Sequence, residues 1–255
     1  MSVAPQTARS QDTPAVRWGF VGTGSIANSM ARIVRMTPMA DLVGVSSRRM
    51  ESARSFAETH GAGKAFDSWA ELASWDGVDA IYVATPTSVR EEICVAAANA
   101  GKHVLGEKPF ASLPSLQRIS TACRKNGVGF MDGTHFVHHP RTATLQSKMA
   151  DNVGRPWSVD SAFQFNLPDK GNIRYNPQLE PMGAIGDAGW YNMRAAVEYL
   201  SSDIELQSVS AFIRRDPGTG AAVGGSGVLV FDDLSLIHIS EPTRPNAPSR
   251  MPSTA

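Results

Sequence analysis

The alternation of short apolar segments with longer amphipathic ones between residues 16 and 133 is the feature that most constrains the fold. Strands that alternate with helices of about 10–15 residues form parallel sheets, because the chain must cross back over the sheet before each new strand. Helices then cover both faces of the sheet. We therefore predict an α/β fold whose first domain, residues 16–150, is a doubly wound parallel sheet. Its expected strands are 16–22, 41–47, 64–68, 78–86, 103–109 and 128–133.

Beyond residue 150 the hydrophobic period changes to two. In the segment WSVDSAFQF, Trp157, Val159 and Phe163 share one face, and mostly polar side chains share the other. This alternation is typical of a sheet with one solvated face. We predict a second α/β domain over residues 151–233. Its elements are strands at 157–165, 205–213 and 227–233 and a helix over about 184–200.

The last segment, residues 234–255, reads LSLIHISEPTRPNAPSRMPSTA and holds four of the 16 prolines. Its letters resemble the translation of a common transposase sequencing adapter. We interpret the segment as a non-native tail; a natural proline-rich disordered tail is the alternative. A three-stranded sheet that stops after residue 233 would leave an open edge, so we expect the second domain to be truncated. Residues 1–15 form a polar arm that we expect to be disordered.

The charge balance and the cysteine content exclude several classes of function. Lys and Arg together number 24, as do Asp and Glu, so the chain has no excess of basic charge to attract nucleic acid. Cys94 and Cys123 cannot build a disulfide framework, and the N-terminus lacks the apolar core of a secretion signal. No apolar run reaches the ~18 residues that cross a bilayer. We expect a cytoplasmic protein without nucleic-acid or membrane partners.

A glycine-rich turn, GTGSIA, begins at Gly22, directly after the first strand, and opens the first helix. It is the G-x-G-x-x-A form of the Rossmann dinucleotide fingerprint. Gly22 permits the tight turn, Gly24 lets the backbone approach a pyrophosphate, and Ala27 packs the helix against the strand. The N–H groups and the dipole at the helix N-terminus, around Ser25 and Ile26, then attract the phosphates. A plain tight turn is the alternative.

The end of the second strand decides between NAD and NADP. An NAD site usually offers Asp or Glu about 20 residues after the glycines to accept from the ribose 2′-OH, whereas a 2′-phosphate requires Arg and hydroxyl donors. Here the chain offers Ser46, Ser47, Arg48 and Arg49 and no carboxylate. Because two guanidinium groups suit a dianionic phosphate, NADP is favoured over NAD. The alternative is that one or both arginines only solvate the start of the next helix.

Two further turns follow the fourth and fifth strands at the carboxyl edge of the sheet, where ligands of such folds bind. The first carries Thr85 and Pro86, and the second carries Glu107 and Lys108. We expect all four residues to lie near the cofactor. A lysine there can hold a substrate hydroxyl beside the nicotinamide and stabilise the alkoxide that forms as hydride leaves. A solvated surface lysine is the alternative for Lys108.

Four segments carry a resemblance to a known family: GFVGTGSIA, VDAIYVATPTSVREE, AGKHVLGEKPFA and EPMGAIGDAGWY. With them the sequence resembles the glucose–fructose oxidoreductase and inositol 2-dehydrogenase (Gfo/Idh/MocA) family over residues 16–233. The resemblance implies a nicotinamide domain followed by a mostly antiparallel α/β domain, whose sheet holds the substrate and often makes the oligomer interface. It places the family's catalytic lysine on Lys108 and implies that the parent enzyme is a homo-oligomer.

The segment DAGWY, from Asp187 to Tyr191, resembles the family's D-x-G-x-H motif with tyrosine in the histidine place. This variant is similar to dihydrodiol dehydrogenases and D-xylose 1-dehydrogenases, and it implies that the tyrosine is the acid/base. Spaced i and i+4 on an expected helix, both side chains would share one face. Lys108 would help Tyr191 accept the substrate proton, while Asp187 would hydrogen-bond a neighbouring hydroxyl. A core tyrosine and a helix-capping aspartate are the alternative.

Two aromatic residues complete the expected substrate site. His135 and Trp190 are expected substrate contacts. His138 and His139 are interpreted as structural, because the histidine cluster lacks a carboxylate or cysteine partner in its segment and so does not suit a metal. We therefore expect no metal site.

Three hypotheses about function follow. The favoured one is an NADP-dependent oxidoreductase that transfers a hydride between nicotinamide and a secondary alcohol or hemiacetal of a small sugar, polyol or cyclic diol. The second is an NADP-binding regulator without catalysis, against which the presence of Lys108 and Tyr191 counts. The third is an inactive truncated fragment of such an enzyme. Arg90 and Val137 replace a histidine and an arginine frequent in the family, so the substrates of better-known members do not transfer.

Overall fold

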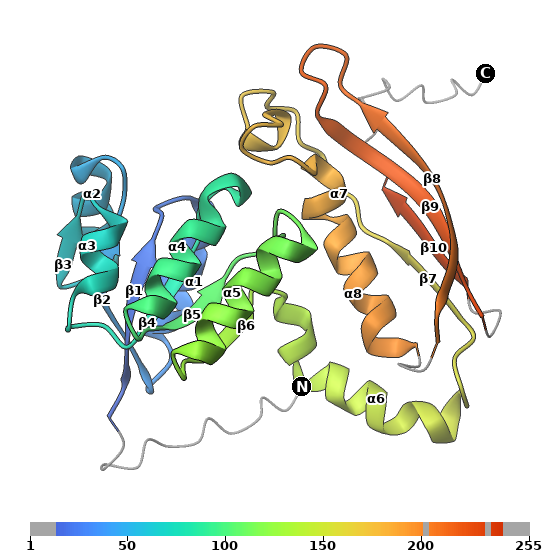
Figure 1. The fold of residues 1–255 in the computed structure, drawn as a ribbon, viewed down its shortest axis with the longest axis horizontal. Coiled ribbons are helices and arrows are strands. Elements are labelled where there is room, and N and C mark those ends of the chain that lie inside the picture. Colours follow the sequence, from blue (N-terminus) through green and yellow to red (C-terminus); the bar gives the residue numbers. More distant parts are fainter. Residues whose placement is uncertain (1–13, 201–203, 233–235, 242–255) are drawn as a thin grey trace, which may run out of the picture. The chain divides into compact units, whose positions relative to one another are not determined.

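The computed structural model describes residues 14–200, 204–232 and 236–241 (Figure 1). The chain divides into two compact units, Met1–Gly133 and Thr134–Ala255. Most of the expected N-terminal arm, and the tail beyond residue 241, lie outside the described residues. Within the described ranges, no helix has the length and apolar character needed to cross a membrane.

The first unit is built on a six-stranded parallel sheet with the strand order β3-β2-β1-β4-β5-β6. Helix α1 contacts α2, while α4 contacts both α3 and α5, so the crossover helices form two layers. The predicted doubly wound sheet is confirmed. The strands are β1 Val16–Val21, β2 Ala40–Ser46, β3 Lys64–Phe66, β4 Ala80–Val83, β5 His103–Gly106 and β6 Phe130–Asp132. The helices are α1 Ser25–Arg35, α2 Met50–His60, α3 Trp69–Ser74, α4 Thr87–Asn99 and α5 Leu113–Lys125.

The core of this unit explains why its central strands are continuous apolar runs. All four residues of β4 are buried. Phe20 of β1 meets Tyr82 of β4 edge to face, with 4.8 Å between the ring centroids. Val45 of β2 and Phe56 of α2 belong to the same cluster. A central parallel strand is covered on both faces, so it has no solvated side to alternate with.

The strand order fixes where a ligand can bind. From β1 the chain continues to β2 on one side, and β4, β5 and β6 are added on the other. The loops that leave the carboxyl ends of β1 and β4 therefore diverge, and doubly wound sheets bind ligands in the crevice that this opens. The glycine-rich turn follows β1 at this edge, and the loop that carries Lys108 follows β5.

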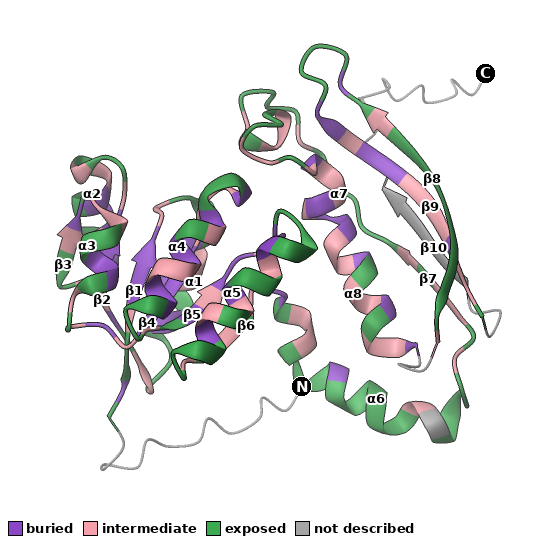
Figure 2. Ribbon diagram, in the orientation of Figure 1, coloured by how far each residue is buried: buried purple, intermediate pink, exposed green. Residues whose placement is uncertain are grey.

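The second unit is built on a four-stranded sheet with the order β7-β10-β9-β8. Strand β9 is antiparallel to β8 and β10, and β10 is parallel to β7. Helix α8 lies against the sheet, where Ala196 and Leu200 pack with Leu229. Figure 2 shows β8 exposed along nearly its whole length. The elements are η1 His135–His138, α6 Pro140–Asn152, β7 Ser158–Ala162, η2 Ile173–Tyr175, α7 Gly183–Asp187, α8 Gly189–Tyr199, β8 Leu206–Arg215, β9 Ala222–Phe231 and β10 Leu236–Glu241.

The boundary between the two units lies at residues 133 and 134, whereas the sequence places a domain boundary at 150. Two hydrogen bonds tie the segment after Gly133 to α8. Gln146 Nε2 of α6 donates to the Glu198 carboxylate at 2.9 Å, and Trp190 Nε1 donates to Thr134 Oγ1 at 2.7 Å. A helical pattern such as that of α6 looks the same in either unit, so periodicity alone does not assign this helix to one unit or the other.

Strand β10 corrects the expectation of a three-stranded sheet with an open edge after β9. Its residues fall in the segment interpreted as non-native, yet they pair antiparallel with β9 and parallel with β7. A bare strand edge presents a row of N–H and C=O groups, and the alternating segment LIHISE suits pairing with it. The non-native origin of residues 234–255 stays an interpretation of the sequence.

Candidate functional site

At its first position, Gly22, the glycine-rich turn has a backbone conformation that is favourable only for glycine. Gly22 has a φ of +107°, and its N–H donates to the Ser46 carbonyl oxygen at 2.9 Å. A Cβ added to Gly22 would lie 2.6 Å from the Ala84 carbonyl oxygen. The turn after β1 is therefore pressed directly against the chain that leaves β4.

Replacing Gly22 by alanine should damage both the fold and dinucleotide binding, because the new methyl group meets backbone that cannot rotate away. We expect a melting temperature lower by several degrees and an affinity for NADPH at least about tenfold weaker. Gly61→Ala is the matched control, since Gly61 also has a positive φ of +72° but nothing lies within 4 Å of its added Cβ. It should bind NADPH normally. Unchanged binding by Gly22→Ala in a fluorescence titration would contradict this role.

The helix that follows the turn leaves its N-terminus open. Gly24 is the N-cap of α1, no side chain caps the helix, and its first turn holds no acidic residue. A Cβ added to Gly24 would meet nothing within 4 Å, and Ser25 and Ile26 are exposed. Free N–H groups at a helix N-terminus, together with the helix dipole, bind phosphate groups. The residues present therefore fit the pyrophosphate of a dinucleotide.

Hydroxyl and guanidinium groups gather at the end of β2. Thr23 Oγ1 lies 3.5 Å from Ser47 Oγ, a contact that joins this strand end to the glycine-rich turn. Ser46 is buried, and its Oγ has no hydrogen-bond partner among the described residues. Arg48 and Arg49 are exposed, and neither guanidinium is paired within the described part of the chain. An unpaired hydroxyl and two unpaired guanidinium groups suit an anionic ligand.

The loops after β4 and β5 hold four of the predicted residues. Glu107 is buried and accepts a hydrogen bond from the Tyr82 hydroxyl at 2.6 Å. Lys108 follows it and is half-buried. Thr85 Oγ1 is buried with no hydrogen-bond partner in the described ranges, and Pro86 is the N-cap of α4. The structure therefore brings these predicted residues to the sheet edge that carries the glycine-rich turn, and it adds Tyr82, which the sequence did not single out.

A buried arginine joins these two loops. Arg90 lies in α4 and is 4% exposed. Its guanidinium donates to the carbonyl oxygens of Thr85 and Pro109 and, at 3.2 Å, to the Thr87 hydroxyl. It therefore fixes the loop that carries Lys108 relative to the loop after β4. The sequence marks Arg90 only as a departure from the family pattern, because both carbonyl groups belong to backbone that the sequence cannot place.

The cysteines and histidines outside the proposed site have structural surroundings. Cys94 and Cys123 are free and buried. Burial raises the pKa of the Cys94 thiol to about 12 and also raises the pKa of Cys123, so neither supplies a thiolate at neutral pH. His139 accepts a hydrogen bond from the Arg141 N–H at the start of α6. Among the described residues, no group of three or more His, Cys, Asp or Glu could hold a metal ion.

In the second unit, Asp187 and Tyr191 lie on two consecutive helices. Helix α7 ends at Asp187 and α8 begins at Gly189, with Ala188 between them. The prediction of one helix over 184–200 is wrong at this point. The segment GAIGDAG carries three glycines, and each glycine weakens a helix.

Asp187 is paired with an arginine that the sequence did not single out. Arg174 Nε donates to Asp187 Oδ2 at 2.5 Å, and the Asp187 side chain is 13% exposed. Burial opposes the charge on Arg174, but the hydrogen bond and attraction from Asp187 raise the Arg174 pKa overall. The hydrogen bond from Arg174 holds the Asp187 carboxylate in one place. Thirteen residues separate the partners, so no helical spacing signals the contact.

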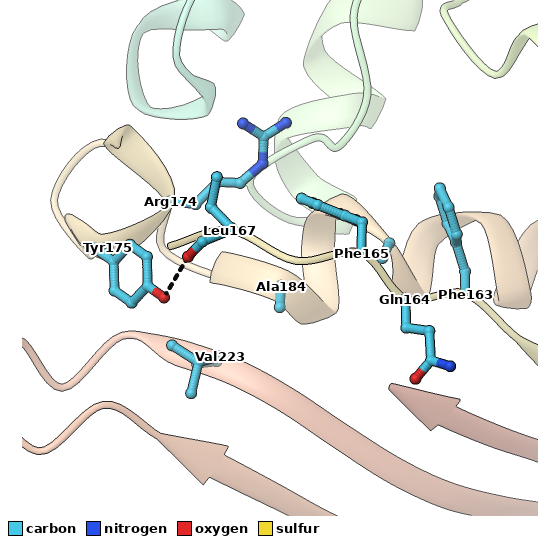
Figure 3. Close-up of a pocket in the computed structure, with 10 residues that line it drawn as sticks. Phe163, Gln164, Phe165, Leu167, Arg174, Tyr175, Ala184 and Val223 are labelled. Carbon is cyan, nitrogen blue, oxygen red and sulfur yellow. Dashed lines mark hydrogen bonds between the residues drawn. The ribbon is translucent and has the colours of Figure 1, made fainter. Parts of the chain in front are cut away.

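Arg174 also lines a narrow pocket within the second unit (Figure 3). Phe165, Ala184 and Val223 give this pocket apolar walls. The Arg174 guanidinium carbon lies 5.9 Å from the centroid of the Phe165 ring, within the range of a cation–π contact. Arg174 is therefore shared between an apolar pocket and the Asp187 carboxylate.

Tyr191 lies in an aromatic cluster with His135. Its hydroxyl is 3.2 Å from His135 Nδ1, and the two rings meet edge to face with centroids 5.4 Å apart. Phe163 packs nearly perpendicular to Tyr191, at 5.2 Å. The structure therefore brings two predicted residues, Tyr191 and His135, together. Trp190 Nε1 donates to Thr134 Oγ1, so this N–H is used within the second unit.

These features define a class of protein. A doubly wound parallel sheet, a glycine-rich turn and an open helix N-terminus at the switch point make the first unit a Rossmann dinucleotide-binding domain. Residues 16–134 match the model of the GFO_IDH_MocA family, described as an oxidoreductase family with an NAD-binding Rossmann fold. The chain belongs to this family, as its sequence motifs predict.

Similar proteins act on sugars. The chain is 32% identical over 217 residues to a dTDP-3,4-didehydro-2,6-dideoxy-alpha-D-glucose 3-reductase of Actinomadura kijaniata, a match that covers 84% of this chain and 64% of that protein. It is 30% identical to D-xylose 1-dehydrogenase (NADP(+)) 2 of Haloferax volcanii, which covers 87% of this chain and 68% of that protein. The chain thus spans about two thirds of the length of these relatives.

A solved structure has the same fold. It is KijD10, a 3-ketoreductase from Actinomadura kijaniata in complex with NADP and TDP-benzene. The TM-score is 0.83 at 28% identity, and the match covers 90% of this chain and 70% of that one. The α/β fold of both units is therefore that of family reductases.

Proposed function

We propose that this chain is an NADP-dependent oxidoreductase that moves a hydride between nicotinamide and a CH–OH carbon of a small sugar, polyol or cyclic diol. The observation that carries the proposal is the position of Lys108, which follows β5 at the same sheet edge as the glycine-rich turn after β1. In an open α/β sheet this edge is where a bound dinucleotide and its substrate lie.

The preference for NADP rests on the end of β2. Arg48 and Arg49 have unpaired guanidinium groups, and Ser47 adds a hydroxyl, so a 2′-phosphate would find donors there. A free ribose 2′-OH would find no carboxylate to accept its hydrogen bond. The xylose dehydrogenase relative is an NADP(+) enzyme by name, and the similar ketoreductase binds NADP, which supports the same preference.

The substrate chemistry follows from the side chains. When bound, the nicotinamide supplies the carbon that gives or takes the hydride. The Lys108 ammonium would donate to the substrate oxygen and stabilise negative charge on it during the transfer. Tyr191 would accept the proton of the substrate hydroxyl or return it. His135 would orient the Tyr191 hydroxyl. Asp187, held by Arg174, would accept a hydrogen bond from a neighbouring substrate hydroxyl.

The proposed setting is a cytoplasmic homo-oligomer. Two free, buried cysteines suit a reducing compartment. Strand β8 lies at the edge of its sheet and leaves Leu206, Val209 and Phe212 more than half exposed, and exposed apolar side chains on an edge strand favour association with another chain.

Turnover assays test this function. The chain would be mixed with NADP and a panel of aldoses, cyclic polyols and trans-diols, and with NADPH and keto sugars, while the nicotinamide absorbance is followed. We expect turnover with at least one polyhydroxylated compound. Saturable NADPH binding without turnover across both panels would favour a cofactor-binding regulator and would contradict the proposed activity.

A further inference from the structure

A buried histidine lies behind the glycine-rich turn. His60 is the last residue of α2, and it is only 5% exposed. Its Nε2 lies 2.7 Å from Asn28 Oδ1, on the first helix after the turn. Its ring also packs on Phe56, with 4.5 Å between the centroids. His60 is therefore in direct contact with the helix whose N-terminus faces the proposed cofactor.

Asn28 is bound to the turn itself. Its Nδ2 donates to the carbonyl oxygen of Thr23 at 3.1 Å and to that of Gly24 at 2.9 Å. An asparagine amide has two N–H hydrogens, so both are used by these carbonyls. The Oδ1 atom must then be the one that faces His60. It can only accept, and therefore His60 Nε2 must donate.

The two carbonyl contacts determine where the neighbouring N–H groups point. In a planar trans peptide the C=O and the N–H point in opposite directions. The Thr23 carbonyl shares its peptide unit with the Gly24 N–H, and the Gly24 carbonyl shares its unit with the Ser25 N–H. Because Asn28 holds both carbonyls, both N–H groups are directed away from Asn28, and these are donors that a pyrophosphate would use.

His60 completes this arrangement without a charge. Burial lowers the pKa of His60, and the nearby Arg32 and Arg35 lower it further, so the ring is neutral at pH 7. A neutral imidazole has one N–H, and here it is used on Asn28. If that donor were removed, Asn28 Oδ1 would lose its hydrogen bond to His60, and the amide would be held less firmly against the two carbonyl groups that its Nδ2 contacts.

We propose that His60 is a positioning residue for the cofactor, acting through Asn28 to hold the N–H groups of the glycine-rich turn toward the pyrophosphate. The inference rests on the proposed dinucleotide binding. It assigns a role in that binding to a residue 32 positions away from Asn28, at the far end of α2. The simpler view, in which His60 only fills space against Phe56, makes different predictions.

Two substitutions at His60 separate these views. His60→Phe keeps a ring for packing but loses the N–H, and His60→Gln loses the ring but keeps a side-chain N–H donor. In fluorescence titrations with NADPH, we expect His60→Phe to bind about fivefold more weakly, the effect of one lost hydrogen bond between neutral groups. His60→Gln should recover most of that loss. If both variants bind as the parent does, or if Gln binds no better than Phe, the proposal is wrong.

An Asn28→Ala background tests whether His60 acts through Asn28. There, His60→Phe should change NADPH affinity by less than about 1.5-fold, because the relay is already broken. An undiminished effect of His60→Phe in that background would overturn the proposal.

Amide hydrogen exchange of the cofactor-free chain gives a readout that does not need binding. The Asn28 backbone amide, which donates to the Gly24 carbonyl oxygen at 3.0 Å, should exchange faster in His60→Phe than in the parent and His60→Gln chains, and unchanged exchange would count against the relay. If the parent chain binds neither NADPH nor NADH while His60→Phe still loosens this amide, the proposed function fails and the relay between His60 and the turn stands as a structural one.

Discussion

Changing Lys108 to methionine should remove turnover almost completely and leave NADPH affinity within about twofold. Methionine has a similar length but no ammonium group, so it cannot donate to the substrate oxygen or stabilise charge on it. Loss of such a group typically costs about 10²–10⁴ in rate. The measurement is kcat on the best substrate of the panel, together with an NADPH titration.

Lys102→Met is the matched control. Lys102 lies just before β5, at the other end of the strand from Lys108, where its Nζ donates to the Val78 carbonyl at 3.0 Å. It should keep kcat within about twofold, because this contact is remote from the proposed chemistry. A Lys108→Met variant with the kcat of the parent chain would contradict the catalytic role assigned to Lys108.

The double substitution R48S/R49S should convert a strong NADPH preference into a weak one. Hydrogen bonds from a charged group are each worth about 1.5–3 kcal/mol when well formed, but both arginines are exposed, so solvent screening reduces the effect. We expect NADPH affinity to fall about 10- to 100-fold. NADH affinity should change less than about threefold, because NADH has no 2′-phosphate.

Arg54→Ser serves as the control for net charge. Arg54 is exposed on the same helix, α2, but lies beyond its first turn. This substitution should leave the affinities for NADPH and NADH within about twofold of those of the parent chain. Added salt should also narrow the NADPH preference of the parent chain, since it screens exposed charges. Equal losses for NADPH and NADH in R48S/R49S would show that the arginines support the fold and not the 2′-phosphate.

The first unit is largely predictable from sequence, because its signals are local. Continuous apolar runs such as β4 mark central parallel strands, and the GTGSIA turn lies where a strand meets a helix. Gly22 illustrates why the motif works. Its positive φ and the nearby Ala84 carbonyl both require a residue without a Cβ, so a glycine at this position of the sequence indicates the local backbone geometry.

The contacts that complete the site could not be predicted in this way. Arg174 meets Asp187 across 13 residues, and His60 meets Asn28 across 32, without a spacing rule that connects them. Arg90 bonds to backbone carbonyls, which carry no sequence signature. Such contacts depend on how elements pack in space, and hydrophobic periodicity does not encode that packing.

The second unit was harder to predict for a further reason. Its strands are partly exposed, so alternation gives their positions but not their order in the sheet. The glycines around Ala188 interrupt an otherwise regular helical pattern. Strand β10 pairs with β9 and β7 although its letters resemble translated adapter sequence, since backbone pairing requires only an extended segment beside a bare edge.

A pair of fluorescence titrations of the purified 255-residue chain, one with NADPH and one with NADH, tests the central claim most directly. We expect saturable binding of NADPH that is at least about tenfold tighter than binding of NADH, equivalent to about 1.4 kcal/mol. Equal or tighter binding of NADH would contradict the role given to the arginines after β2. Binding of neither would contradict the proposal that this chain is an NADP-dependent oxidoreductase.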